Sequence, residues 1–129
     1  MKEIKENNKF EIKKEYVSFS FSSLCENKKY NFDYLDKSKD VRKGFEIYKN
    51  LMNRIIEIEN TAWVEFIQKH KDVGIETLKK KNLKIDLDIK DEKVIVIRFN
   101  DKKCRIVGVK EEKVFKILAF DFDFTLYKH

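Results

Sequence analysis

The chain has 129 residues, of which 42% are hydrophobic and 40% are charged, which is enough apolar content for the core of one domain. Because the charged residues are mixed in sign, they fit a solvated surface and not a disordered tail. The formal net charge of +6 favours an anionic partner, such as nucleic acid, the ribosome, an acidic protein or an anionic membrane surface, although a lysine-rich solubilising surface accounts for it equally well.

Membrane, secreted and metal-binding classes find little support in the sequence. The apolar runs are four residues or fewer, far short of a membrane span, and Met1 to Lys5 does not begin an apolar signal segment. Cys25 and Cys104 are isolated thiols without a histidine nearby, so neither a zinc site nor a disulfide framework is predicted. We expect a single domain over residues 1–129, in a reducing cytoplasm, without a metal or other cofactor.

The first half of the chain predicts one strand and two helices. Residues 16–21 alternate between apolar and serine side chains, which is the period of a half-buried strand, and residues 25–39 are expected to form an irregular loop. After the suitable N-cap Asp40, apolar residues recur at helical spacing as far as Asn60, and a second helix follows from Ala62. The residues expected to face the sheet are Val41, Phe45, Tyr48, Met52, Ile55, Trp63 and Phe66.

The second half of the chain predicts four strands. Residues 75–81 are interpreted as one more helical turn, after which the apolar period changes to two. Strands are expected at 83–90, 94–99, 104–110 and 114–122, and the short turns between them predict an antiparallel meander. The predicted fold is therefore α+β: an N-terminal strand, a two-helix hairpin, and a four-stranded antiparallel meander with both helices packed on one sheet face.

Two arginines on these strands are candidate phosphate-binding groups. Arg98 interrupts an apolar central strand, where a charge needs either a carboxylate partner or a route to water. It either pairs at the sheet rim with Asp86, Asp88 or Asp121, or projects toward phosphate from the face opposite the helices. Arg105 follows Lys102 and Lys103, so that end of the meander forms either a solvated hairpin or a phosphate grip. The predicted RNA-binding set is Lys102, Lys103, Lys110 and Lys128.

The C-terminal residues add groups suited to stacking and proton transfer. Tyr127 offers a ring for a base and His129 a proton-transfer group, although such a tail is also typical of a disordered end. Asp121 and Asp123 lie two residues apart on a strand and would share one face, but no third acidic group is placed nearby for a metal. The candidate catalytic residues are Arg105, Arg98, Tyr127 and His129.

The order of elements and two short motifs resemble the RelE/ParE superfamily of small bacterial toxins. The run Cys104 to Gly108 resembles the family's tyrosine-arginine-aliphatic strand, with Arg105 at the arginine, and Leu126-Tyr127 resembles its terminal aliphatic-tyrosine step. The wider C-terminal run also resembles the tail of uncharacterised bacterial proteins, in which a histidine is expected where Phe124 stands. The family's lysine-rich catalytic loop has no evident counterpart in the helical region.

The resemblance implies a toxin that binds RNA and cleaves mRNA on the ribosome. The reaction would be metal-independent attack of a ribose 2′-hydroxyl on the adjacent phosphate, with Arg105 and Arg98 stabilising the developing charge and Tyr127 or His129 handling the proton. A cognate antitoxin protein would then be a partner. Two alternatives stay open: a non-enzymatic phage- or mobile-element-encoded inhibitor of a host or defence nuclease, and a gyrase poison. Whether the chain is an enzyme, its true partner and its oligomeric state are not decided by the sequence.

Overall fold

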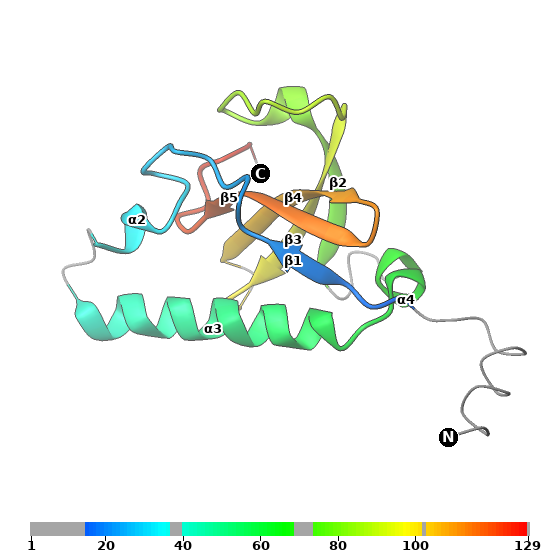
Figure 1. Cartoon of the computed structure of the whole chain (residues 1–129). Coiled ribbons are helices and arrows are strands. Elements are labelled where there is room, and N and C mark those ends of the chain that lie inside the picture. The colour runs from blue at the N-terminus through cyan, green and yellow to red at the C-terminus, as the bar shows by residue number, and fades with distance from the viewer. Residues whose placement is uncertain (1–14, 37–39, 69–73, 102, 129) are drawn as a thin grey trace, which may run out of the picture.

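The computed structural model describes residues 15–36, 40–68, 74–101 and 103–128. The chain forms a five-stranded sheet in the order β1-β5-β4-β3-β2, with one long helix lying beneath it (Figure 1). The strands are β1 (Ser18–Ser20), β2 (Ile75–Lys79), β3 (Lys93–Phe99), β4 (Cys104–Glu111) and β5 (Val114–Asp121). The helices are α2 (Asp33–Asp36), α3 (Val41–Glu59) and α4 (Trp63–Gln68), and one 3-10 turn covers Lys80–Asn82. The predicted α+β class is confirmed.

The sheet is mixed because it contains one parallel pair of strands beside three antiparallel pairs. Strands β2 to β5 pair antiparallel with their neighbours in chain order, whereas β1 pairs parallel with β5 through partners such as Phe19 and Phe115. The β4–β5 pairing shifts register between Val107 and Gly108. A Cβ at Gly108 would lie 2.3 Å from both the Lys116 carbonyl oxygen and Phe115 Cε1, so this position requires glycine.

The predicted strand at 83–90 and the predicted helical turn at 75–81 are both wrong. The strand beside β3 is β2, at residues 75–79, and the segment around Leu83 and Leu87 crosses the sheet face instead of joining the ladder. Both leucines are 8% exposed, and Leu83 makes an isolated bridge with Tyr127. Alternation of apolar and polar residues shows that one side of an extended segment is buried. An extended segment that lies across a sheet face is buried on one side as well, so its sequence resembles that of a strand.

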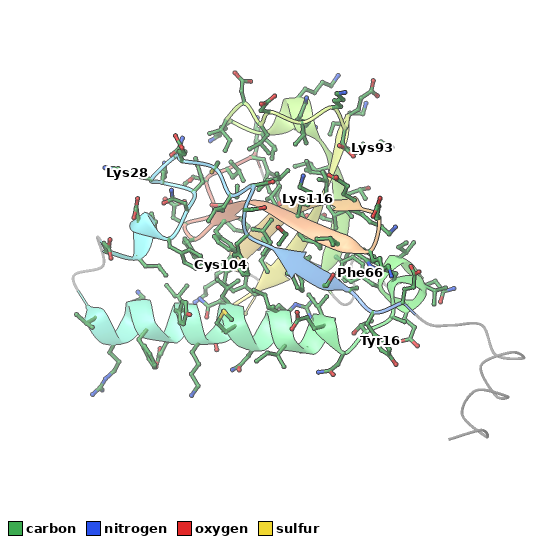
Figure 2. All side chains as sticks on the ribbon, in the orientation of Figure 1. Tyr16, Lys28, Phe66, Lys93, Cys104 and Lys116 are labelled. Atoms are coloured by element: carbon green, nitrogen blue, oxygen red, sulfur yellow. The ribbon has the colours of Figure 1, made fainter. Side chains whose placement is uncertain are left out.

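Buried side chains cover both faces of the sheet. On one face, Leu51 and Ile55 of α3 and Phe66 of α4 pack against strand residues such as Ile106. Figure 2 shows Phe66 and Cys104 directed into the interior, while Lys28 and Lys93 project from the periphery. On the other face the cover is non-helical and consists of Tyr30, Leu83, Leu87, Leu126 and Tyr127.

The predicted helix face is partly wrong. Helix α3 begins after Asp40, whose side chain accepts hydrogen bonds from the backbone N–H groups of Arg42 and Lys43. Ile55, Trp63 and Phe66 are buried as predicted, and Met52 is half-buried. The exposed fractions of Val41, Phe45 and Tyr48 are 83%, 65% and 43%, because the sheet contacts the stripe formed by Gly44, Leu51, Ile55 and Ile58 instead. The predicted two-helix hairpin is matched only in part, because the second helix, α4, has six residues in the part of the chain that the structure describes.

Candidate functional site

Three charged residues form a row across the face opposite α3. Arg98 on β3 is the register partner of Arg105 on β4, and Arg105 is the partner of Asp121 on β5. Directly opposed residues of neighbouring strands point to the same face, so the three side chains lie next to one another. The sequence placed Arg98 and Arg105 on adjacent strands but did not predict that they oppose each other.

Arg105 is a buried residue that organises the C-terminal segment. Only 5% of it is exposed, so Arg105 itself is not part of a solvated hairpin. Its Nε donates to Tyr127 Oη at 3.1 Å, and its Nη1 donates to the Cys104 carbonyl oxygen at 3.1 Å. Its guanidinium lies 4.6 Å from the ring centroid of Phe124. The structure therefore brings Arg105 and Tyr127 together, but in the interior.

Tyr127 continues this network to a residue that the sequence analysis missed. Its hydroxyl donates to Glu76 Oε1 at 3.1 Å, which connects the C-terminal segment to β2. Burial raises the pKa of the Tyr127 phenol, and the nearby Arg105 opposes that rise. Glu76 was missed because residues 75–81 were interpreted as a helical turn. A helical turn does not pair with β3, so the side of the sheet on which Glu76 lies could not be predicted.

The acidic pair stabilises a turn and holds no recognisable metal site. Asp121 is fully buried, and its two carboxylate oxygens accept hydrogen bonds from the backbone N–H groups of Thr125 at 2.9 Å and Leu126 at 3.0 Å. Asp123 accepts a hydrogen bond from the Thr125 hydroxyl. Within the part of the chain that the structure describes, no three His, Cys, Asp or Glu side chains gather closely enough to hold a metal ion.

The predicted RNA-binding lysines do not form one surface. Lys103 precedes β4, whereas Lys110 lies near the opposite end of that strand, with its ammonium 5.1 Å from the Trp63 ring centroid. Lys128 is exposed at the C-terminal end. The predictions for Lys102 and His129 fall outside the described residues. Arg98 is half-buried, and its carbonyl oxygen accepts a hydrogen bond from Arg54 Nε at 3.0 Å.

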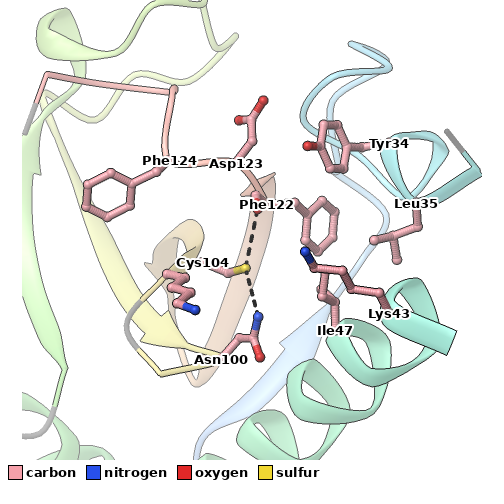
Figure 3. Close-up of a pocket in the computed structure, with 10 residues that line it drawn as sticks. Tyr34, Leu35, Lys43, Ile47, Asn100, Cys104, Phe122, Asp123 and Phe124 are labelled. Carbon is pink, nitrogen blue, oxygen red and sulfur yellow. Dashed lines mark hydrogen bonds between the residues drawn. The ribbon is translucent and has the colours of Figure 1, made fainter. Parts of the chain in front are cut away.

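Lys103, one of the predicted RNA-binding lysines, lines a pocket of about 700 Å³. The pocket opens between α2, the first half of α3, the β3–β4 hairpin and the segment after β5 (Figure 3). Lys43 projects from α3 toward its centre, and Tyr34 faces it from α2. The lining residues are Tyr34, Leu35, Lys43, Ile47, Asn100, Lys103, Cys104, Phe122, Asp123 and Phe124.

Hydrogen bonds connect two of the residues that line the pocket, Asn100 and Cys104, to their surroundings. Asn100 has a positive φ of 52° in the hairpin turn, its amide nitrogen lies 3.7 Å from Cys104 Sγ, and its amide oxygen accepts from Asn50 at 2.7 Å. The Cys104 thiol donates to the Phe122 carbonyl oxygen at 3.5 Å. Burial raises the pKa of Cys104, so this thiol stays protonated near neutral pH.

The walls of the pocket combine aromatic rings with charges of both signs. Tyr34 stacks on Phe122 with ring centroids 5.7 Å apart, and Phe124 is 42% exposed beneath the Arg105 guanidinium. Burial, with the nearby Asp123 carboxylate, raises the pKa of Tyr34, which keeps its hydroxyl protonated. Phe124 has a φ of 66°, a region that a bulky side chain seldom adopts, so its position is imposed by the surroundings.

Most of the pocket lies beyond what the sequence indicated. Lys103 was predicted as a binding residue, but Tyr34, Lys43 and Asn100 were not, because nothing in their spacing shows that α2, α3 and the hairpin meet. No helix among the described residues is long and apolar enough to cross a membrane. No protein-family model, curated protein or solved structure matches the chain, so the resemblance to RelE/ParE toxins stays a prediction that rests on the sequence motifs and the order of elements.

Proposed function

We propose that the protein binds single-stranded RNA, with one base and its adjoining phosphate held in this pocket. The observation that carries the proposal is one pocket lined by two partly exposed aromatic residues, Tyr34 and Phe124, and by two lysines, Lys43 and Lys103. Aromatic rings stack bases of unpaired strands, and lysines neutralise the backbone between them. The net charge of +6 favours the same anionic partner.

Each lining group has a chemical role in this proposal. Phe124 presents a half-exposed ring that Arg105 holds from behind, which makes it the stacking platform. Lys43 and Lys103 contact phosphate oxygens as point charges. Asp123 Oδ1 is engaged by Thr125, which leaves Oδ2 to accept a hydrogen bond from a ribose 2′-hydroxyl. A carboxylate at that position favours RNA over DNA, because deoxyribose lacks this donor.

Arg105 and Tyr127 act in this proposal as positioning residues. A guanidinium that stabilises a reacting phosphate must contact it, and Arg105 is 5% exposed behind Phe124. Their burial therefore favours binding over the cleavage mechanism that the toxin resemblance implies. Growth arrest by a toxin of this kind would then follow from occupying RNA on the ribosome and not from cutting it.

The test is a titration of a labelled single-stranded RNA with the purified protein, followed by fluorescence anisotropy at several salt concentrations. The affinity of the wild type should fall with salt, and Lys43→Ala and Lys103→Ala should each reduce the slope of log affinity against log salt by about 0.7. Lys113→Ala removes the same charge from the exposed β4–β5 turn and should leave the slope unchanged. Phe124→Leu should weaken binding about tenfold or more.

Two further readouts separate binding from the alternatives. Asp123→Asn should reduce the preference for RNA over the DNA strand of the same sequence while retaining most of the phosphate affinity. Equal affinity of the wild type and of the Lys43, Lys103 and Phe124 variants would refute the pocket assignment. Electrophoresis of the bound RNA, and primer extension after expression in cells, should show intact RNA; specific cleavage would instead favour a nuclease.

A further inference from the structure

Helix α3 carries a second apolar stripe that the fold leaves largely exposed. The buried stripe contains Leu51, Ile55 and Ile58. The second stripe consists of Val41, Phe45, Tyr48, Met52 and Ile56, which follow one another at steps of three or four residues. Ile56 is 53% exposed, and Val41 and Phe45 are exposed to 83% and 65%, while Met52 is half-buried. On a helix of 3.6 residues per turn this stripe runs along one side, next to the buried one.

The charges of α3 are arranged against its own dipole. After the N-cap Asp40, the first turn contains Arg42 and Lys43 and no acidic residue, and the last turn contains Glu57 and Glu59 and no basic residue. A helix favours negative side chains at its N-terminus and positive side chains at its C-terminus. Apart from the capping carboxylate of Asp40, the charges within both end turns of α3 are therefore unfavourable for the isolated helix. A second helix running in the opposite direction would place acidic residues beside the basic end and basic residues beside the acidic end.

We propose that the chain forms a two-fold symmetric dimer in which the α3 helices of two copies pack antiparallel along this stripe. The same patch is then used by both copies, which is the requirement for a closed two-fold interface. Phe45 of one copy packs near Met52 and Ile56 of the other, and Arg42 lies beside Glu59 of the second copy at both ends. A parallel arrangement would instead place Arg42 against Arg42, so the charges select the antiparallel one.

The dimer leaves the RNA-binding pocket open. Lys43 and Ile47 line the pocket and lie on the flank of the buried stripe away from Val41 and Phe45. The apolar contacts supply the affinity, while the exposed Arg42–Glu59 pairs contribute mainly orientation, because surface ion pairs are weak. The dimer therefore stands independently of the proposed RNA binding, and it implies two pockets per particle.

The test is a mass measurement by size-exclusion chromatography with light scattering over a range of protein concentrations. The wild type should reach twice the chain mass of 15.6 kDa at high concentration. Phe45→Glu should raise the dimer dissociation constant about tenfold or more, with an unchanged circular dichroism spectrum. Ile67→Glu makes the same change at a position of α4 that is 59% exposed and should leave the dimer intact.

A charge exchange tests the antiparallel direction. Arg42→Glu and Glu59→Arg should each weaken the dimer, and the double variant should restore it, because the second copy then supplies the exchanged partner. A wild type that remains monomeric at every concentration would overturn the proposal and leave the stripe to a different protein. A dimer that is insensitive to Phe45→Glu, or additive weakening in the double variant, would overturn the assigned interface or its direction.

Discussion

Replacing Tyr127 with phenylalanine tests whether the C-terminal segment belongs to the core. The substitution removes one hydroxyl, which accepts from Arg105 Nε at 3.1 Å and donates to Glu76 Oε1 at 3.1 Å. A hydrogen bond to a charged group contributes about 1.5–3 kcal/mol. Glu76 is half-buried, so water replaces much of its lost bond, whereas Arg105 is 5% exposed and loses its bond in full. We therefore expect a loss of about 2–3 kcal/mol in the free energy of unfolding.

The measurement is urea unfolding monitored by circular dichroism, with a thermal scan as a check. For a chain of this size the midpoint temperature should fall by about 3–5 °C for each kcal/mol lost. Tyr16→Phe is the matched control, because Tyr16 is 55% exposed, and it should change stability by less than about 0.5 kcal/mol. A loss below about 0.5 kcal/mol for Tyr127→Phe would show that the network does not stabilise the fold.

Three further predictions follow from burial, close packing and ionisation. At protein concentrations where the chain is monomeric, Phe45→Ala should cost less than about 1 kcal/mol because Phe45 is 65% exposed, whereas Phe66→Ala should cost about 3–5 kcal/mol because Phe66 is 1% exposed; urea unfolding of both compares them directly. Gly108→Ala should destabilise by about 1–3 kcal/mol or more, since the added Cβ meets Phe115, and the midpoint of thermal unfolding checks it. Because the pKa of Tyr127 is raised in the fold, its proton is held more tightly there than in the unfolded chain. Stability should therefore fall as pH rises past the ordinary tyrosine value of 10.0, and less so in Tyr127→Phe, as urea unfolding across that range can measure.

The sequence predicted the elements whose local signals and tertiary surroundings agree. Strands β3, β4 and β5 lie within one or two residues of the predicted ranges, because continuous β-branched runs separated by short polar turns leave few other structures. The start of α3 was equally clear, since Asp40 caps it as expected. Apolar runs, polar turns and helix caps depend only on residues that are close in the sequence, so they can be recognised without knowing the rest of the fold.

The predictions that failed are those in which one sequence pattern fits two different structures. The alternation of Leu83 and Leu87 with polar residues fits a strand of the sheet, and it fits equally an extended segment that lies across the sheet face. The two possibilities differ in which segment pairs with β3, and in the structure that segment is β2. Val41 and Phe45, four residues apart, belong to a genuine apolar stripe of α3, but the sheet packs against the neighbouring stripe. A sequence that carries two apolar stripes on a single helix cannot say which of them meets the core.

The candidate site was predictable in part for a related reason. Arg105 and Tyr127 were singled out from short motifs, and the structure joins them, but their burial depends on Leu83, Leu126 and the rest of the non-helical cover. The residues that line the pocket come from α2, α3, the β3–β4 hairpin and the segment after β5. No local sequence pattern predicts that these four segments lie close together. Residues such as Lys43 and Asn100 therefore become functional candidates only once the fold is known.

Two departures from ordinary protein chemistry meet at Arg105. Its cross-strand neighbour is a second arginine, Arg98, although like charges directly opposite each other are destabilising. The ring beneath its guanidinium belongs to Phe124, which occupies the left-handed region at a φ of 66°. Residues in sparsely populated backbone regions often lie at functional sites, where the surrounding structure imposes the conformation. Because Phe124 lines the pocket, this unusual backbone conformation lies at the surface that we propose for base stacking.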